Sequence, residues 1–380
     1  MNLPNEAESS GAGEAANGEQ RIPKKLGDLQ KNITMAQIAK AAGVSQGAIS
    51  SLLNDRDYGI RVSEKTRERV FKVCREMGYI PNDLRAVVRM YPELGDCCLL
   101  IPASHGAGLR DPVTARIAAA AMSGLTEPAR AITIAAYDEK IDYLIDPDAL
   151  PQPVRAGVCS KFLCVGASSH LLLQALHRRG APVASLGHDA ALPGVLSIVP
   201  DYAQGSRLAI EHLHKLGHRQ IGIVSGPFGA TDSPLLELNR GVRLACDELG
   251  LPIDARMLVY GDLSEKTGRT AVDELFAQQP RPTAIFCMSD AAAAGVLAAA
   301  HARGLKVPAE LSVVGCADDL GARCTHPMLT TIHIPAEEMA TLAVREIERL
   351  VREPAGDDTR RIVLPVSLVT RESTAPLPST

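Results

Sequence analysis

The 380-residue chain contains no apolar run that approaches the roughly 20 residues needed to cross a bilayer. The segment from Met1 to Gln20 is rich in Gly, Ala, Glu, Asn and Ser, and it lacks the apolar stretch of a secretory signal. We therefore expect no membrane partner and a cytoplasmic location. Such a polar composition also predicts that residues 1–31 form a disordered tail, and we expect a short second tail at 375–380.

The chain beyond residue 96 also lacks the motifs of common enzymes. It has no Gly-x-Gly-x-x-Gly turn, Walker loop, Gly-x-Ser-x-Gly elbow or His-Glu-x-x-His pair. The nine cysteines include no Cys-x-x-Cys pair and lie mostly in apolar runs, which is typical of buried, reduced thiols. We therefore expect no metal, no cofactor and no catalytic site, and we do not expect an enzyme.

What the chain does have is enough apolar sequence for two or three domains, with 46% hydrophobic and 22% charged residues. Beyond residue 96, short apolar runs alternate with helical patterns. Strands are predicted at 97–101, 131–136, 161–165, 183–186, 220–224, 284–288 and 312–315, and helices at 114–128, 168–179, 202–216, 239–249, 265–278 and 290–303. This alternation indicates doubly wound parallel sheets, with enough units for two.

The most informative segment is 33–54, where two short helical patterns are joined by Gly-Val-Ser. Gly43 is placed to end the first helix in a left-handed conformation, and Ser45 is placed to cap the second. Apolar residues with the spacing of two facing helices are Ile38, Ala42, Val44, Ile49 and Leu52. The pattern is typical of a helix-turn-helix that reads the major groove of DNA. An ordinary helical hairpin within a larger core is the alternative.

A third helix is predicted to begin after Ser63 and to end at Gly78, with Pro81 just beyond. Between Lys31 and Tyr91 there are eleven Lys/Arg and six Asp/Glu residues, a net charge of +5, whereas the whole chain carries −4 and the remainder therefore −9. A basic region on an acidic body is suited to phosphate contact at one end only, although a solvated helix face has the same composition.

These motifs resemble the lactose-repressor (LacI/GalR) family. The resemblance rests on Ala-Lys-Ala-Ala-Gly-Val-Ser at 39–45, Val-Ser-Glu-Lys-Thr-Arg-Glu-Arg-Val at 62–70, Met-Gly-Tyr-Ile-Pro-Asn at 77–82, Leu-Gly-His-Arg-Gln-Ile-Gly at 216–222 and Leu-Thr-Thr-Ile at 329–332. It extends from about Ile33 to Thr374. It implies an α-helical, amino-terminal helix-turn-helix head and an α/β, bilobed body like that of periplasmic binding proteins, built from two doubly wound parallel sheets.

The expected domains are the helix-turn-helix at 32–80, a hinge helix and linker at 81–96, and an effector-binding and dimerisation domain at 97–374, with the chain crossing between lobes near 200, 333 and 364. In the family the hinge forms on DNA and inserts an apolar wedge into the minor groove, a position that Val88 holds here. The expected DNA-binding residues are Thr34, Ser45, Gln46, Gly47, Ser50, Ser51, Asn54, Ser63, Thr66, Tyr79, Asn82, Arg85 and Val88.

Ligands of open α/β sheets bind beyond the carboxyl ends of the strands. The expected effector-binding residues are Ser104, Asp138, His188, Phe228, Arg240, Ser289, Asp290 and Asp318. Asp290 is the strongest of these, because the resemblance implies that it accepts hydrogen bonds from ligand hydroxyls. Its alternative role is to cap the helix that begins at Ala291.

The chain departs from the family at three positions that matter for a ligand. Leu238 stands where many members have Arg, Leu263 where an aromatic is common, and Gly187 where a carboxylate is frequent. With no Trp and 3% aromatic residues, the flat surfaces on which sugars stack are scarce. A sugar, a related non-sugar metabolite, or no ligand at all therefore remain open.

The function that the resemblance implies is a sequence-specific transcriptional regulator. We expect a repressor that binds a palindromic DNA operator as a homodimer, is modulated by a small-molecule effector, and is associated with the bacterial nucleoid. The alternative is a periplasmic-type solute-binding protein, which shares the bilobed body but has neither the basic head nor DNA binding.

Overall fold

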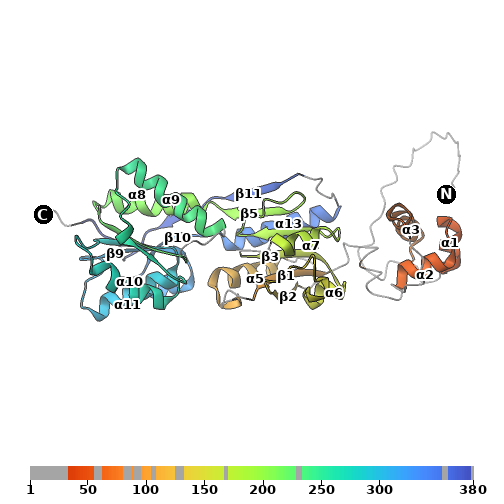
Figure 1. Cartoon of the computed structure of the whole chain (residues 1–380), viewed down its shortest axis with the longest axis horizontal. Helices are drawn as coiled ribbons and strands as arrows, with labels where there is room; N and C mark the ends of the chain where they lie inside the picture. Colours follow the sequence, from red (N-terminus) through yellow and green to blue (C-terminus); the bar gives the residue numbers. More distant parts are fainter. Residues whose placement is uncertain are drawn as a thin grey trace, which may run out of the picture. The chain divides into compact units, whose positions relative to one another are not determined.

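The computed structural model describes residues 33–54, 62–79, 88, 96–103, 108–124, 132–166, 170–227, 233–352 and 358–377. Contacts divide the chain into two compact units, Met1–Met90 and Tyr91–Thr380. The described part of the first unit is helical, and the second unit is α/β (Figure 1). Within these described ranges, no helix is both long and apolar enough to span a membrane.

The first unit contains α1 (Met35–Ala42), α2 (Gln46–Asn54) and α3 (Glu64–Met77). Helix α1 packs against both of the others. Gly43 ends α1 with a left-handed φ of 64°, and Gly78 ends α3 in the same way with a φ of 70°, as predicted. The shared core is formed by Ile38, Ala39, Ala42, Ala48, Ile49, Leu52, Leu53, Val70, Phe71 and Cys74.

The second unit contains two six-stranded sheets, each with helices on both faces. We call each sheet with its helices a lobe, and number the lobes 1 and 2. The sheet of lobe 1 has the order β11-β5-β4-β3-β1-β2, and its neighbouring strands are all parallel. The bounds are β1 (Asp96–Pro102), β2 (Ile132–Tyr137), β3 (Cys159–Val165), β4 (Val183–Leu186), β5 (Leu196–Pro200) and β11 (Arg360–Leu364). Helices α5 (Pro112–Gly124) and α13 (Ala336–Arg352) pack on one face, and α6 (Gln152–Arg155) and α7 (His170–His177) on the other.

The sheet of lobe 2 has the order β12-β10-β9-β8-β6-β7, with only the edge strand β12 antiparallel among its described strands. Its strands are β6 (Ile221–Ser225), β7 (Leu258–Tyr260), β8 (Ala284–Cys287), β9 (Ser312–Ala317), β10 (Thr330–His333) and β12 (Ser367–Val369). Helices α8 (Tyr202–Lys215) and α9 (Ser233–Leu249) cover one face, and α10 (Glu265–Phe276) and α11 (Asp290–Ala302) the other. Shorter helices are α12 (Leu320–Cys324), η3 (Gly108–Arg110), η4 (Pro147–Ala149) and η5 (Ala255–Met257).

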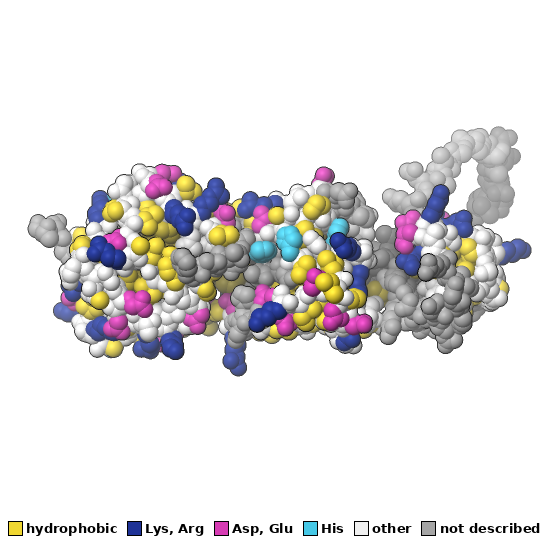
Figure 2. Space-filling model, in the orientation of Figure 1, with side chains coloured by type: hydrophobic (Ala, Val, Ile, Leu, Met, Phe, Trp, Pro, Cys, Tyr) yellow, Lys and Arg dark blue, Asp and Glu magenta, His cyan; other side chains and the backbone are white. Residues whose placement is uncertain are grey.

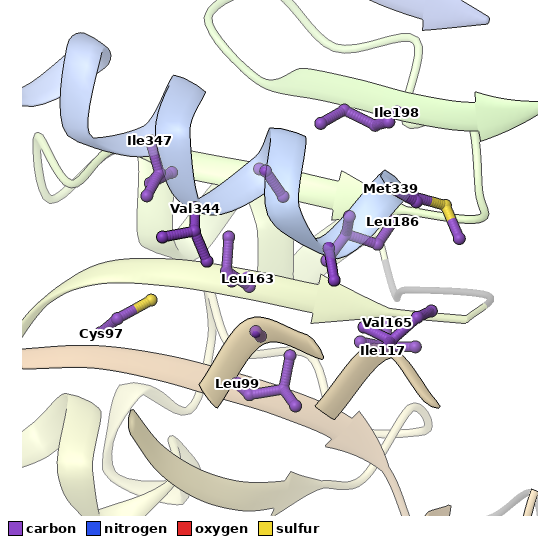
Figure 3. Close-up of a cluster of buried hydrophobic side chains, with 14 of the residues drawn as sticks. Cys97, Leu99, Ile117, Leu163, Val165, Leu186, Ile198, Met339, Val344 and Ile347 are labelled. Atoms are coloured by element: carbon purple, nitrogen blue, oxygen red, sulfur yellow. The ribbon is translucent and has the colours of Figure 1, made fainter. Parts of the chain in front are cut away.

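Helix α13 closes the core of lobe 1. Its buried residues recur at helical spacing, and Val344 and Ile347 point onto the sheet beside Leu163 (Figure 3). The central strand β1 is buried along almost its whole length because helices cover both faces of the sheet, which explains its continuous apolar sequence.

The chain passes between the lobes three times. After β5 it enters lobe 2 as α8, after β10 it returns to lobe 1 as α13, and after β11 it enters lobe 2 again as β12. Each lobe is therefore built from segments that are distant in sequence.

Each strand and helix predicted beyond residue 96 has a counterpart, with described ends that differ by up to six residues, as at the start of α9. The predicted hinge at 81–96 lies mostly outside the described residues, as do the predicted positions 125–128, 131, 168 and 169. The prediction was incomplete, because it missed β5, β7, β10, β11, β12 and α13. The cysteines are free thiols, and all are buried except Cys324. Burial raises the pKa of the Cys97 thiol to about 12. Charged side chains of both signs are interspersed over the visible face of the two lobes (Figure 2).

Candidate functional sites

The first unit presents the amino-terminal end of α2 to solvent. The Ser45 hydroxyl accepts a hydrogen bond from the Ala48 N–H at 3.1 Å and so caps the helix, as predicted. Gln46 and Gly47, the first two residues of α2, are exposed. On the opposite face Ile49 is fully buried. One face of the first turn of α2 is therefore fixed by the core, and the opposite face is exposed to solvent.

The two other helices of this unit begin with capping hydroxyls as well. Thr34 and Gln37 form a capping box at the start of α1, and Ser63 caps α3 through the Thr66 N–H. Three helix amino termini, each with a favourable dipole for an anion, therefore lie in one small unit. Basic side chains that are exposed on it are Lys40, Lys65, Arg67, Arg69, Lys72 and Arg75.

Other residues predicted to contact DNA are less exposed to solvent. Ser50 and Ser51 are partly buried on α2, and Tyr79 is half-buried after α3. Val88 is a buried helical residue. The Asn54 side chain and the residues Asn82 and Arg85 lie outside what the structure describes.

In the second unit, the strand orders locate a switch point in each sheet. In lobe 1 it lies between β1 and β3, and in lobe 2 between β6 and β8. Ligands of doubly wound sheets bind beyond the strand ends at such points. Ala103, Gly166 and Gly226 directly follow β1, β3 and β6, and Ser289 is the second residue after β8. The predicted residues Ser104 and Phe228 lie outside the described ranges.

Ser289 is the cap of α11, and Asp290 is the first residue of the helix. The Ser289 hydroxyl accepts from the Ala292 N–H at 3.0 Å and donates to the Leu263 carbonyl at 2.7 Å. The alternative role foreseen for Asp290, that of capping a helix beginning at Ala291, was therefore wrong.

The Asp290 carboxylate is buried and links the end of β8 to β9 and β10 through hydrogen bonds. One oxygen accepts from the Thr331 hydroxyl on β10, and the other accepts from the Asp319 N–H after β9 at 2.9 Å. Burial raises the pKa of this carboxyl to about 6, against the lowering effect of the Thr331 hydrogen bond. A Cβ on Gly315 would lie 2.3 Å from the Asp290 carboxylate, so glycine is required at that point of β9.

Asp318 follows β9 with a left-handed φ of 54° and is also buried. Its carboxylate accepts hydrogen bonds from the Arg371 guanidinium and from His333 Nδ1, the latter at 3.0 Å. Burial alone would raise the pKa of this carboxyl, but the hydrogen bonds from Arg371 and His333 outweigh it and lower the pKa.

The other effector candidates lie apart from this group. Asp138, after β2, is exposed, and its carboxylate accepts from the Lys140 N–H at 2.9 Å. His188, after β4, is half-buried. Arg240 lies in the middle of α9, is 65% exposed and pairs with Glu237 at 3.4 Å. Ser289, Asp290 and Asp318 are thus brought together at neighbouring strand ends of lobe 2, and Asp138 and His188 follow strands of lobe 1.

Comparison with known proteins identifies the fold and its family. Residues 34–82 match the model of bacterial regulatory proteins of the lacI family, and residues 210–374 match a periplasmic binding protein-like domain. The HTH-type transcriptional regulator DegA of Bacillus subtilis (strain 168) is 31% identical over 351 residues, which cover 90% of this chain and 98% of DegA. The chain belongs to the lacI family.

Two solved structures of regulators are also similar to this lacI-family regulator. The transcriptional regulator CelR in complex with cellobiose is 26% identical, with a TM-score of 0.65, over 90% of this chain and all of that one. The lac repressor dimer bound to operator and the anti-inducer ONPF is 25% identical, with a TM-score of 0.62, over 91% of this chain and all of that one. The helix-turn-helix and the bilobed α/β body that the resemblance implied are confirmed.

The departures of this regulator from its family have local explanations. Leu238 is 4% exposed in the core of lobe 2, so its position on α9 faces inward, while Arg240 faces solvent. Gly187 has a left-handed φ of 79°. Leu263 has a left-handed φ of 60°, and its carbonyl holds the Ser289 hydroxyl.

Sequence reasoning missed several residues at or in contact with these strand ends. They are Arg116, Gly166, Gly226, Thr331, His333 and Arg371. Gly166 directly follows the apolar run 162–165, and Gly226 comes two positions after the apolar Ile223 and Val224, which is a signal that could have found them. The others depend on contacts across 15 to 221 positions of sequence, for which the local pattern gives no sign.

Proposed function

We propose that this regulator binds a palindromic operator as a homodimer and represses transcription, with a small-molecule effector between the two lobes that modulates operator affinity. The observation that carries the proposal is the capped, exposed amino-terminal turn of α2, in a family of DNA-binding regulators. One such helix reads one half-site, so a two-fold operator requires two copies of the chain.

The proposed interface combines phosphate contacts with base readout. The hydroxyls of Thr34, Ser45 and Ser63 stand at helix amino termini, where phosphate oxygens are favoured. Gln46 is the exposed side chain at the head of α2 that can form a bidentate pair with adenine. We further propose that residues 81–96 form the hinge and that Val88 is its minor-groove wedge.

We expect Gln46→Ala to reduce discrimination between operator and random DNA by about 5- to 150-fold, because a bidentate pair to a base is worth about 1–3 kcal/mol. Salt-dependent binding to random DNA should change little, since that binding depends on phosphate contacts. Operators are first selected from genomic fragments by mobility shift, and affinities are then measured by fluorescence anisotropy.

The matched control is Gln204→Ala, which removes an exposed glutamine from α8 in the other unit. It should leave both affinities unchanged. Equal losses of specific and nonspecific binding in Gln46→Ala would show that Gln46 does not read bases. If no fragment is retarded by the wild-type chain, the proposed function is wrong.

The effector is proposed to bind at the switch points of the two sheets, with Ser289 and Asp290 on the lobe 2 side. Relatives bind sugars, as in the complex of CelR with cellobiose. The scarcity of aromatic residues in this chain extends the proposal to related polar metabolites. A screen of sugars, sugar acids, nucleosides and amino acids by thermal shift tests this, because a ligand at a hundredfold excess over its Kd adds about 2.7 kcal/mol of stability.

We expect Asp290→Asn to lose most of the stabilisation that a compound from this screen gives the wild-type chain. Thr331→Val is the matched variant, since it removes the hydroxyl that Asp290 accepts but leaves the carboxylate in place. It should retain the stabilisation. Equal responses of the two variants would show that Asp290 only joins the strand ends and does not touch the ligand.

The proposed function is binding rather than catalysis, in agreement with relatives that are transcriptional regulators. Because operator DNA is the proposed partner, we propose that the protein acts in the cytoplasm, in association with the bacterial nucleoid.

A further inference from the structure

Arg116 on α5 makes an ion pair inside lobe 1. Its Nε donates to Glu337 Oε1 and its Nη2 to Glu337 Oε2, both at 2.7 Å. Glu337 stands in the first turn of α13, the helix that covers the same face of the sheet as α5. This two-pronged pair fixes the direction of the guanidinium, since a planar fork that meets a carboxylate leaves little freedom of rotation.

The same guanidinium also reaches lobe 2. Nη1 donates to the Ala317 carbonyl at 2.9 Å, and Nη2 donates to the Ile334 carbonyl at 3.0 Å. Ala317 is the last residue of β9, and Ile334 follows β10 in the segment that connects lobe 2 to α13. The Arg116 side chain is only 19% exposed, so water competes weakly for these bonds.

The lobe 2 carbonyl that accepts this hydrogen bond belongs to a turn with positive φ angles. Ala317 and Asp318 have φ values of 146° and 54°, which side chains other than glycine rarely adopt. Such a conformation persists only where its surroundings fix it. From lobe 2 the turn is held through the Asp318 carboxylate and the Asp319 N–H. Among the described residues of lobe 1, only Arg116 donates a hydrogen bond to the Ala317 carbonyl.

The arrangement can release without leaving a buried charge unpaired. Rotation of lobe 2 away from α5 would break the bond to the Ala317 carbonyl, since an N···O distance beyond about 3.5 Å no longer makes one. The Ile334 carbonyl also accepts from the Ala336 N–H of α13 at 2.8 Å, so it belongs to the connector and would stay beside Arg116. The guanidinium would keep its Glu337 partner, because both belong to lobe 1. The contact is therefore present in one arrangement of the lobes and absent in another. Breaking it costs less free energy than breaking an ion pair between lobes, because no buried charge loses its partner.

We propose that Arg116 is a positioning residue that latches the two lobes at the angle seen here, and so sets the operator affinity that depends on this angle. This inference rests on the proposed function for its link to DNA. The latch itself is a property of residues 96–377 and is measured without DNA. A ligand that binds the two lobes at another angle has to overcome it, which makes Arg116 part of the effector response.

The test is Arg116→Met, which keeps the length of the stem and removes the N–H donors, in the full chain. A spin label on the exposed native thiol Cys324 of lobe 2 and one on Lys140→Cys of lobe 1 report the distance between lobes. Labelled chain is diluted with unlabelled chain so that pairs within one chain dominate. We expect a broader or longer distance distribution than in the chain with Arg116, and a shift of operator affinity by about 5- to 150-fold.

The matched control is Arg207→Met. Arg207 pairs with Glu211 and Glu248 on α8 and α9, so it joins two helices within lobe 2. It should leave the distance distribution unchanged even if it lowers the melting temperature. If Arg116→Met does not fold, Arg116→Lys is used, because one ammonium cannot serve a carboxylate and two carbonyls together.

An unchanged distance distribution in the Arg116 variant overturns the latch, whatever happens to stability. A changed distribution with unchanged operator affinity overturns the link between latch and DNA. If the wild-type chain retards no DNA, the proposed function fails, while the comparison of distances still decides the latch.

Discussion

Gly268→Val is expected to lower the free energy of unfolding of the second unit by about 3 kcal/mol or more. A Cβ on Gly268 of α10 would lie 1.9 Å from the Ala292 carbonyl oxygen of α11. In the same interface, a Cβ on Gly295 of α11 would lie 2.0 Å from the Glu265 carbonyl oxygen. The two helices meet backbone to backbone, so a side chain at this point has to push them apart. Urea denaturation followed by circular dichroism measures the loss.

The effect should extend to the candidate effector site. Helix α11 begins with Ser289 as its cap and Asp290 as its first residue, so its displacement moves both. The first unit should keep its fold and its nonspecific DNA binding. Gly124→Ala is the control, because a Cβ on Gly124 would meet only Val344, at 3.9 Å. An equal loss of stability in both variants would refute the close approach of α10 and α11.

Glu348→Gln is expected to cost about 3–5 kcal/mol of unfolding free energy, because it leaves a buried ammonium without its counter-charge. Lys161 on β3 is 1% exposed, and its Nζ donates to the Glu348 carboxylate of α13 at 2.9 Å. The amide of glutamine can still accept a hydrogen bond, but it carries no charge to offset the desolvation of the lysine. The midpoint of urea unfolding is the readout.

The control for this variant lies on the same helix. Glu338→Gln changes an exposed carboxylate and should stay within about 0.5 kcal/mol of the wild type. The double variant Lys161→Met with Glu348→Leu should regain most of the stability, because removing both charges removes the desolvation cost. A large loss in the double variant and a small one in Glu348→Gln would contradict the assignment.

Features decided by neighbouring residues could be predicted from the sequence. The caps Ser45 and Ser63 and the left-handed Gly43 and Gly78 follow from hydroxyl and glycine chemistry within a few positions. The central strands could be predicted because both of their faces are buried, which makes them continuous apolar runs. Five strands were missed, and among these β11 begins with two arginines and β7 and β12 have three residues each.

The charged residues with the largest structural roles could not be predicted. Lys161 begins an apolar run, where a lysine normally indicates the solvent-facing end of a strand, yet α13 lies across it from a distance of 187 positions. Arg116 lies in the first turns of a helix, where a solvent-exposed arginine is ordinary, and its partners come from positions 317, 334 and 337. Asp290 was identified as a candidate, but the two bonds of its carboxylate within the chain depend on Asp319 and Thr331.

The placement of β11 and β12 has a consequence for synthesis on the ribosome. Strand β11 completes the edge of the lobe 1 sheet and β12 that of the lobe 2 sheet, and both come from the last 21 residues of the chain. Until translation reaches these residues, β5 and β10, which are interior strands of the finished sheets, are left as unpaired edges. The three helices of the first unit need only local contacts and can form much earlier. A prematurely terminated chain would therefore carry a complete helix-turn-helix beside two unfinished lobes.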